Sequence, residues 1–184
     1  MTAEQFKIVR WREWDGPGIE HLELRERAGE VLADSVVICS GQTPFAIRYR
    51  IECDASWRTR SVTVDMIGSG RTLVLAADGK GNWFRDGLPV PELDGALDPD
   101  LTVTPFTNTL PIRRMRLSTG QSAKITTAFI EFPALTVVSN PQRYTCLQEG
   151  RRYPYESRAS DFKRELEIDR DGLVVDYPDF WQRG

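Results

Sequence analysis

The segment FAIRYRIEC, Phe45–Cys53, alternates apolar and polar side chains almost without a break. Successive side chains of a β-strand point to opposite faces of the sheet, so residues two apart share a face. One face of this segment carries Phe45, Ile47, Tyr49 and Ile51, and the other is mostly charged. The pattern predicts a half-buried strand, which turns an apolar face to a core and a polar face to water.

The same period of two extends from this segment toward both ends of the chain. Tight turns rich in glycine, proline, asparagine and aspartate separate the repeats, and Asp171-Gly172 is a strong hairpin signal. Helical patterns are short and few, at Pro89–Leu97 and Ala159–Glu165. The predicted strands are Phe6–Trp14, Ile19–Arg27, Val31–Cys39, Arg58–Ile67 and Thr72–Asp78 in the first half, and Ser122–Phe132, Leu135–Ser139, Gln142–Gln148, Tyr153–Ser157, Phe162–Asp169 and Gly172–Pro178 in the second.

About a dozen strands joined by short turns predict a mainly antiparallel, all-β protein with little helix. So many strands cannot remain in one flat sheet, so the sheet must curl, close or split into two layers. A length of 184 residues suggests one domain, 1–184. The strands fall in similar numbers on either side of the segment 98–114, which suggests two similar halves of one strongly curved sheet.

Composition excludes some classes of function. The net charge of −3 argues against a nucleic-acid partner, because nucleic-acid-binding domains carry a basic face. The N-terminus lacks the apolar core of a signal peptide, and no apolar run approaches the roughly 18 residues of a membrane-spanning helix. The chain has three cysteines, Cys39, Cys53 and Cys146, and no two of them have the spacing of a metal-binding or redox-active pair. We therefore expect a cytoplasmic protein, whose oligomeric state the sequence leaves open.

The segment DPDLTVTPFTNTLPIRR, Asp98–Arg114, breaks the alternation. Proline restricts the residue before it to extended conformations, so Thr104 and Leu110 are predicted to be extended. A buried arginine needs a carboxylate partner, which Asp98 or Asp100 would supply. The segment therefore has two interpretations, an arginine–aspartate clamp that holds an irregular crossover or a loop that binds an anion or a polar headgroup.

Catalytic signals are weak. His21 is the one histidine, and it falls in a predicted strand, so it is more typical of a half-buried structural residue than of a general base. The carboxylates Asp94, Asp98 and Asp100 fit turn chemistry, although paired carboxylates also serve glycoside hydrolysis. We expect no metal and no cofactor, because the chain contains none of the phosphate-loop, dinucleotide or zinc motifs.

The segment Leu97–Gln121, LDPDLTVTPFTNTLPIRRMRLSTGQ, resembles the central signature of the bacterial family named "putative glycolipid-binding", formerly a domain of unknown function. WDGPGIEHLEL, YRIECDASWRTRSVTV, QRYTCL, YPYES and DGLVVDYP extend the resemblance over nearly the whole chain. The resemblance implies a spiral β-roll, similar in architecture to periplasmic lipoprotein carriers that hold acyl chains in curved sheets. Those carriers are exported, whereas no export signal is visible here.

We therefore expect a non-enzymatic protein that binds an amphipathic ligand, a glycolipid or a fatty-acyl compound, in the concavity of the sheet. The alternative is a small hydrolase or isomerase that uses Asp94, Asp98 and Asp100 with Arg113 or Arg114. The expected ligand-binding residues are the aromatic Trp57, Trp83, Phe106 and Tyr144, and the polar Thr107, Asn108, Arg113 and Arg114.

Overall fold

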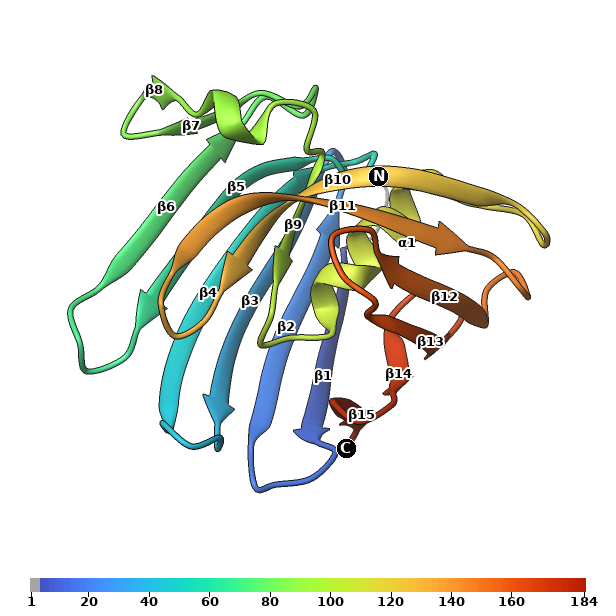
Figure 1. Ribbon diagram of the computed structural model, residues 1–184, viewed down its shortest axis with the longest axis horizontal. Coiled ribbons are helices and arrows are strands. Elements are labelled where there is room, and N and C mark those ends of the chain that lie inside the picture. Colours follow the sequence, from blue (N-terminus) through green and yellow to red (C-terminus); the bar gives the residue numbers. More distant parts are fainter. Residues whose placement is uncertain (1–3) are drawn as a thin grey trace.

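The computed structural model describes residues 4–184 and contains one strongly curved sheet of fifteen strands (Figure 1). From one edge the strands run in the order β8 to β1, then β15 to β9, and every neighbouring pair is antiparallel except β9 with β10. The predicted all-β, mainly antiparallel fold is confirmed, with more strands than the dozen expected. The strands are β1 (Gln5–Glu13), β2 (Ile19–Arg27), β3 (Glu30–Cys39), β4 (Phe45–Asp54), β5 (Thr59–Met66), β6 (Thr72–Ala77), β7 (Trp83–Arg85), β8 (Leu88–Pro89), β9 (Asp98–Leu101), β10 (Ser122–Glu131), β11 (Thr136–Thr145), β12 (Arg152–Ser157), β13 (Lys163–Ile168), β14 (Val174–Tyr177) and β15 (Trp181–Arg183).

Strand β4 has the predicted half-buried pattern. Ile47, Tyr49 and Ile51 are buried, and the two arginines between them, Arg48 and Arg50, face outward. Across the ladder Tyr49 lies opposite Ser35 of β3 and Val64 of β5, both of which are also buried. Because cross-strand neighbours share a face, the apolar sides of the first six strands merge into one concave surface.

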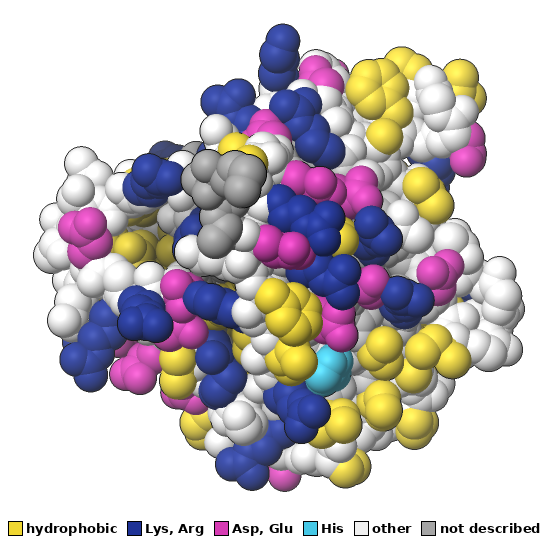
Figure 2. All heavy atoms as spheres, turned by 180° about the vertical axis from the view of Figure 1, so that it is seen from behind, with side chains coloured by type: hydrophobic (Ala, Val, Ile, Leu, Met, Phe, Trp, Pro, Cys, Tyr) yellow, Lys and Arg dark blue, Asp and Glu magenta, His cyan; other side chains and the backbone are white. Residues whose placement is uncertain are grey.

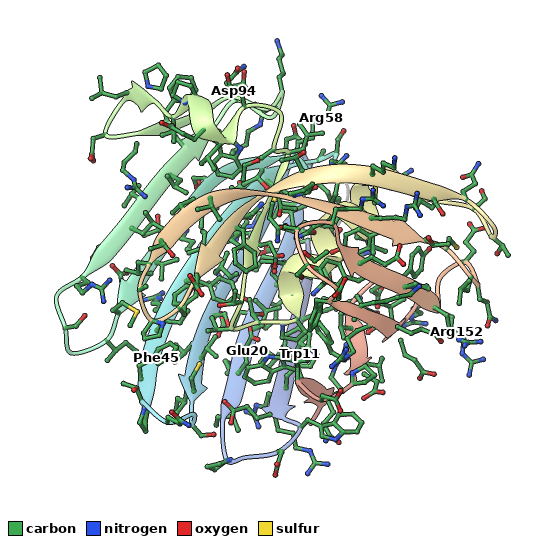
Figure 3. All side chains as sticks on the ribbon, viewed as in Figure 1. Trp11, Glu20, Phe45, Arg58, Asp94 and Arg152 are labelled. Carbon is green, nitrogen blue, oxygen red and sulfur yellow. The ribbon has the colours of Figure 1, made fainter. Side chains whose placement is uncertain are left out.

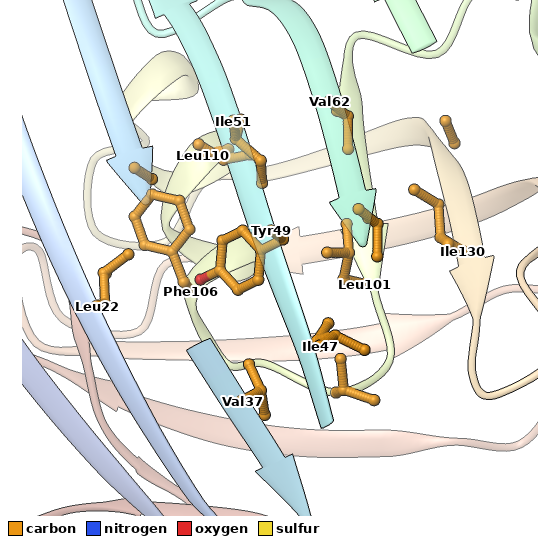
Figure 4. Packing of buried hydrophobic residues seen from close by; sticks show 14 of the residues in the cluster. Leu22, Val37, Ile47, Tyr49, Ile51, Val62, Leu101, Phe106, Leu110 and Ile130 are labelled. Atoms are coloured by element: carbon orange, nitrogen blue, oxygen red, sulfur yellow. The ribbon is translucent and has the colours of Figure 1, made fainter. Parts of the chain in front are cut away.

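The crossover, residues 98–115, fills that concave surface. In Figure 1 it lies between the first strands and the long pair β10–β11, which crosses in front of them. Every residue from 103 to 112 is buried. Leu101, Phe106 and Leu110 pack against side chains of β2 to β5 (Figure 4), and the Phe106 ring stacks on Tyr49 with ring centroids 6.4 Å apart. A polar stretch of sequence thus forms part of the core.

The predicted conformation of Leu110 is wrong. A short 3-10 helix, η2 (Phe106–Asn108), leads directly into the helix α1 (Thr109–Met115). Pro111 lies in the first turn of α1, where the backbone N–H that it lacks would have no partner in the helix. Leu110 is therefore helical although it precedes a proline. Leu110 and Ile112, both on this helix, are buried.

Two other local predictions are wrong. Only a single 3-10 turn, η1 (Pro91–Leu93), forms in the expected helix Pro89–Leu97, and the expected helix Ala159–Glu165 is a bend that enters β13. Ala159–Glu165 joins the paired strands β12 and β13, so hydrogen bonding in the sheet overrides its weak helical pattern. Pro89–Leu97 instead connects β8 and β9, which lie at opposite edges of the sheet.

The last strands enclose a second apolar cluster. It contains Tyr144, Tyr153, Tyr155 and Leu166, with Ile112 of α1 packed among them. The helix therefore contacts both apolar clusters, because Leu110 belongs to the first.

On the opposite, convex side, His21 lies at the surface among charged and hydrophobic side chains (Figure 2), and its Nδ1 accepts a hydrogen bond from Arg10 Nε at 3.2 Å. Within residues 4–184, no helix has the length and apolarity needed to cross a membrane.

Candidate functional site

A largely apolar cavity of about 440 Å³ opens between the crossover and the second half of the sheet. Its volume is within the 300–1,000 Å³ range of small-molecule sites. The walls come from β9 and the crossover residues after it, from β10 to β12, from β14 and β15, and from the segments that precede β13 and β15. The lining residues are Asp100, Leu101, Thr102, Thr104, Asn108, Phe129, Val138, Ser139, Asn140, Tyr155, Ser157, Ala159, Ser160, Phe162, Tyr177, Phe180 and Trp181.

A series of aromatic rings forms one wall. Tyr155 of β12 is buried, Phe162 is half-buried, and Phe180 is exposed at the surface. Neighbouring rings in this series pack with centroids 5.9 Å and 5.4 Å apart, and Tyr177 packs on Phe180 at 5.2 Å. Edge-to-face and tilted aromatic pairs at such distances are stabilising. The rings therefore make a continuous apolar surface from the interior to the mouth of the cavity.

The half-buried carboxylate residue Asp100 also lines the cavity. Strand β9 pairs with β10 so that Asp100 is opposite Phe129, which also lines the cavity. Gln142 Nε2 donates to Asp100 Oδ2 at 2.6 Å, and Thr107 Oγ1 lies 3.4 Å from Oδ1. Burial raises the pKa of Asp100, and the hydrogen bonds from Gln142, Thr107 and Tyr155 oppose that rise.

The side-chain oxygen of Asn140 is a hydrogen-bond acceptor that no donor of the described chain reaches. The residue is 8% exposed, and its Oδ1 has no hydrogen-bond partner among residues 4–184. Its backbone carbonyl, in contrast, accepts from Thr127 Oγ1. A buried polar atom left without a partner costs about 1–3 kcal/mol. Because Asn140 lines the cavity, a molecule inside the cavity can supply the missing donor.

The other buried polar side chains of the lining already have partners. Asn108 Oδ1 accepts from the Tyr144 hydroxyl at 2.8 Å, and its Nδ2 donates to the Pro105 carbonyl at 3.3 Å. Thr104 Oγ1 accepts from the Phe106 backbone N–H at 3.0 Å. These bonds hold the crossover in place, so the unused polar capacity belongs mainly to Asp100 and Asn140.

An arginine–aspartate clamp anchors the crossover, in agreement with the first of the two interpretations of this segment. Arg114 donates from Nε and Nη2 to the two carboxylate oxygens of Asp98, at 3.1 Å and 2.5 Å. Asp98 is fully buried, and burial raises its pKa although Arg114 opposes that rise. Arg113 points elsewhere, with its guanidinium 4.4 Å from the Trp57 ring centroid and hydrogen-bonded to Glu26. The two arginines bind different parts of the sheet because consecutive helical residues diverge.

A buried glutamate connects the sheet to the cavity wall. Glu20 of β2 lies beside Trp11 on the concave side (Figure 3), and its Oε1 accepts from Tyr49 at 2.6 Å and from Ser35 at 2.8 Å. The Tyr49 hydroxyl is also 3.3 Å from Thr104 Oγ1, which lines the cavity. Burial raises the pKa of Glu20 to about 7, and Glu20 Oε2 has no partner within the described part of the chain.

Of the eight residues expected to bind ligand, Asn108 borders the cavity. Thr107 and Tyr144 do not line the cavity, but each contacts a residue that does. Thr107 is hydrogen-bonded to Asp100, and Tyr144 is hydrogen-bonded to Asn108. Phe106 and Trp57 are buried in the core between the crossover and the first strands, and Arg113 and Arg114 make the ion pairs described above. Trp83 is also buried, and its Nε1 donates to the Ala96 carbonyl.

Sequence reasoning missed most of the aromatic wall and Asn140. Phe162 and Phe180 lie in turns, where no periodicity indicates the direction of a side chain. The aromatic pair Phe180-Trp181 and the aromatic alternation at Tyr153 and Tyr155 were the available signals. Asp100 was noted with Asp94, which lies in the exposed turn after η1 (Figure 3).

A second, open cleft of about 520 Å³ differs in charge. Arg114, Lys124 and Arg158 line it, together with apolar side chains. Gln142 borders this cleft and also donates to Asp100, which lines the cavity. A cationic side chain also lies against the aromatic wall of the cavity, because the Arg164 guanidinium is 4.9 Å from the Phe162 ring centroid and 5.7 Å from the Phe180 ring centroid.

Comparison with known proteins agrees with the resemblance in the sequence. A family model described as "Putative glycolipid-binding" matches residues 8–183. The crystal structure of a DUF1089 family protein from Pseudomonas aeruginosa is similar, with 39% sequence identity and a TM-score of 0.78 over 90% of this chain and 92% of that chain. No curated protein matches the sequence.

Proposed function

The chain belongs to the family described as "Putative glycolipid-binding", and from that premise we propose that it binds an amphipathic small molecule in the cavity bordered by Asp100 and Phe180. The single observation that carries the proposal is the cavity itself. It combines a continuous aromatic wall with a few polar groups. Ligand sites of proteins have this composition, because apolar contact supplies affinity and a few polar groups set orientation.

The hydrolase alternative has less support. Two carboxylates that face one cleft are needed for glycoside hydrolysis. Asp98 is held bidentately by Arg114, and Asp94 is exposed on a turn, so Asp100 is the one member of the predicted group that lines the cavity. A lone carboxylate with a buried amide beside it is better suited to hold a ligand than to transfer protons to and from it.

Native mass spectrometry of protein purified from its own host tests the proposal. We expect a co-purifying amphiphile, which organic extraction removes. Thermal unfolding of the extracted protein should then shift upward when an alkyl glycoside is added, because a ligand that binds only the folded state stabilises it.

A Leu101→Trp variant, which fills the cavity from its inner end, should lose both the amphiphile and the shift. Ile67→Ala is the matched control, because Ile67 is 56% exposed and does not line the cavity. Absence of any bound amphiphile together with an unchanged melting temperature for every alkyl compound would refute the proposal. Hydrolysis of an aryl glycoside that is lost in Asp100→Asn would favour the enzyme instead.

A further inference from the structure

The open cleft of about 520 Å³ has no part in the proposed function, and its lining combines positive charge with apolar surface. Arg114, Lys124 and Arg158 line it, and none of the lining residues in the described chain is acidic. The 440 Å³ cavity and this cleft share no lining residue. The cleft is therefore a separate concave surface, whose charge requires its own explanation.

Two of the three cations have no counter-charge. Lys124 and Arg158 are exposed, and neither forms an ion pair with any of residues 4–184. The closest carboxylate to Arg158 along the chain, Glu156, is paired with Lys163 at 2.7 Å. Both cations of the cleft are therefore available to an anion from solution.

The third cation, Arg114, is only partly used. Its Nε and Nη2 donate to the buried carboxylate of Asp98, which leaves Nη1 without a hydrogen-bond partner in the described chain. Asp98 balances the charge of Arg114, so the three cations of the cleft leave a surplus of two positive charges.

The backbone of β10 adds hydrogen-bond donors at the same place. The N–H of Cys146 donates to the Gln121 carbonyl at 2.8 Å, so Ser122, the next residue of β10, belongs to a non-hydrogen-bonded pair with β11. Such pairs alternate along an antiparallel ladder, so the N–H groups of Lys124 and Thr126 also point away from β11. On that side β9 pairs only with later residues of β10, so these N–H groups lie at an open sheet edge, where anions can bind.

The position of Lys124 is unfavourable for the sheet itself. Lys124 lies directly opposite Arg143 of β11, and like charges directly opposite each other destabilise a sheet. The Glu156 carboxylate lies on the other side of Arg143, 3.9 Å from Nη1. An anion bound beside Lys124 would offset this repulsion, so the positive charge at this position suits a ligand better than it suits the fold.

A buried acceptor also borders the cleft. Gln142 is fully buried, its Nε2 donates to Asp100, and its Oε1 has no partner among residues 4–184. A ligand that carries both negative charge and a hydroxyl group fits this combination. A phosphate monoester is such a ligand, because its second pKa is about 6 and one oxygen keeps a proton near that pH. A sulfate or a carboxylate has lost its proton there.

The volume leaves room for more than the phosphate. At about 30 Å³ for each water in the liquid, 520 Å³ corresponds to roughly seventeen waters, of which a phosphate group replaces a minor part. The side chains of Leu97, Met115 and Ile125 border the cleft and supply an apolar surface. The cleft therefore suits a phosphate that is attached to a small apolar body.

We propose that this cleft binds a phosphate monoester. The phosphate group contacts Lys124, Arg158 and Nη1 of Arg114, and the organic part packs on Met115 and Ile125. A soluble phosphate ester and the headgroup of phosphatidic acid share this chemistry. The proposal does not rest on the amphiphile site, because the two concave surfaces are lined by different residues.

Titration of the isotope-labelled protein with phenyl phosphate at about pH 6, followed by NMR, tests the site. We expect the backbone amide signals of Lys124 and Thr126 to shift on binding. Phenyl phosphate should bind at least about fivefold more tightly than phenyl sulfate or benzoate, because it carries more charge and a hydroxyl donor. Shifts that spare these two amides, or equal binding of phenyl sulfate, would overturn the proposal.

Variants of the two exposed cations test the role of charge. Lys124→Ala and Arg158→Ala should each weaken phenyl phosphate by about fivefold. Lys80→Ala and Arg151→Ala are the matched controls, because both residues are exposed, lie outside the cleft and form no ion pair within residues 4–184. Equal losses in the cleft variants and the controls would indicate general attraction to a charged surface and would overturn the site.

The stability of Lys124→Ala separates a ligand role from a structural one. Without ligand, its melting temperature should be unchanged or higher, because repulsion from Arg143 is removed. The rise in melting temperature that phenyl phosphate causes should be smaller in this variant than in the natural chain. A lower melting temperature without ligand, together with an unchanged affinity, would assign Lys124 to the fold and contradict the proposal.

Flotation with phosphatidylcholine vesicles, with and without phosphatidic acid, distinguishes the two sources of the phosphate. Recruitment that requires phosphatidic acid and is lost when Lys124→Ala and Arg158→Ala are combined would identify a lipid headgroup. Binding of phenyl phosphate without recruitment to vesicles would identify a soluble ester. Recruitment that the combined variant retains, together with unchanged binding of phenyl phosphate, would overturn the assignment of the cleft.

Discussion

The two arms of the sheet, β1–β6 and β10–β15, differ in what fills their concave sides. The crossover inserts Phe106 and Leu110 into the first arm, where both are fully buried. The second arm encloses its own cluster of tyrosines and leaves a cavity of about 440 Å³. The same polypeptide segment thus closes one arm and borders the opening of the other. A curved sheet does not by itself create a binding site, because its concave side is available only where no chain segment fills it.

Strand length differs at the end of the second arm. The first five strands and also β10 and β11 have 8 to 10 residues each, whereas β12 to β15 have 6, 6, 4 and 3. Short strands present fewer inward side chains, and beside them residues between strands, Phe162 and Phe180, line the cavity. We call β1–β6 the filled arm and β10–β15 the open arm. The predictions below test whether the filled arm supports stability and the open arm supports binding.

Removal of the ring that fills the first arm should have the largest effect on stability. Phe106→Ala leaves a cavity against Tyr49 and should lower the free energy of unfolding by about 4 kcal/mol. Urea denaturation followed by fluorescence measures this loss. Val138→Ala, at the exposed mouth of the open arm, is the control and should change stability by less than about 0.5 kcal/mol. Similar losses in both variants would remove the distinction between the arms.

Breaking the clamp should have the next largest effect. Arg114→Met leaves the fully buried Asp98 carboxylate unpaired and should cost about 3 kcal/mol. The matched variant Arg113→Met loses a more exposed pair with Glu26 and should cost under about 1 kcal/mol. Adding Asp98→Asn to Arg114→Met should restore part of the loss, because the buried charge is gone. A clamp that contributes nothing would give equal losses for the two arginine variants.

The buried glutamate should make stability depend on pH. Its pKa in the folded protein is about 7, above the ordinary value of 4.5, so the protonated form stabilises the fold. That contribution is complete below pH 4.5 and is lost as pH rises to about 7. The loss should amount to about 2 kcal/mol between pH 5 and pH 8.

Glu20→Gln isolates this contribution, because Asp98 and Asp100 also have raised pKa values and act in the same direction. The difference in unfolding free energy between the variant and the natural chain should grow with pH across this window. Because Glu20 reaches the cavity wall through Tyr49 and Thr104, the protection of crossover amides from hydrogen exchange, relative to their intrinsic rates, should fall as pH rises. A difference that is constant from pH 5 to pH 8 would show that Glu20 does not titrate there.

Replacement of the unpaired amide in the open arm should have the smallest effect on stability and the clearest effect on binding. Asn140→Leu removes an acceptor that has no donor, so the ligand-free protein should be unchanged or stabilised by up to about 1 kcal/mol. Thermal unfolding without ligand measures this. A loss of several kcal/mol would mean that the amide serves the fold rather than a ligand.

The sequence predicted those parts of the molecule in which the side-chain pattern follows backbone geometry. The alternation at Phe45–Cys53 predicted the buried face of β4, and the repeated turns predicted an antiparallel, strongly curved sheet. An aspartate partner, Asp98 or Asp100, was also predicted for a buried arginine of this segment, because a buried guanidinium requires a carboxylate, and the structure shows Arg114 paired with Asp98. These are local requirements, which each segment meets with its own residues and its nearest neighbours.

Tertiary structure decided where the crossover lies and which side chains face the cavity. The sequence of residues 103–112 is rich in threonine and proline, yet all of these residues are buried, because hydrogen bonds such as that of Asn108 with Tyr144 replace those to water. Asn108 and Asn140 are the same residue type, but one is satisfied by a distant strand and the other is not. Local pattern carries no information about such contacts, because they depend on segments that only folding brings together.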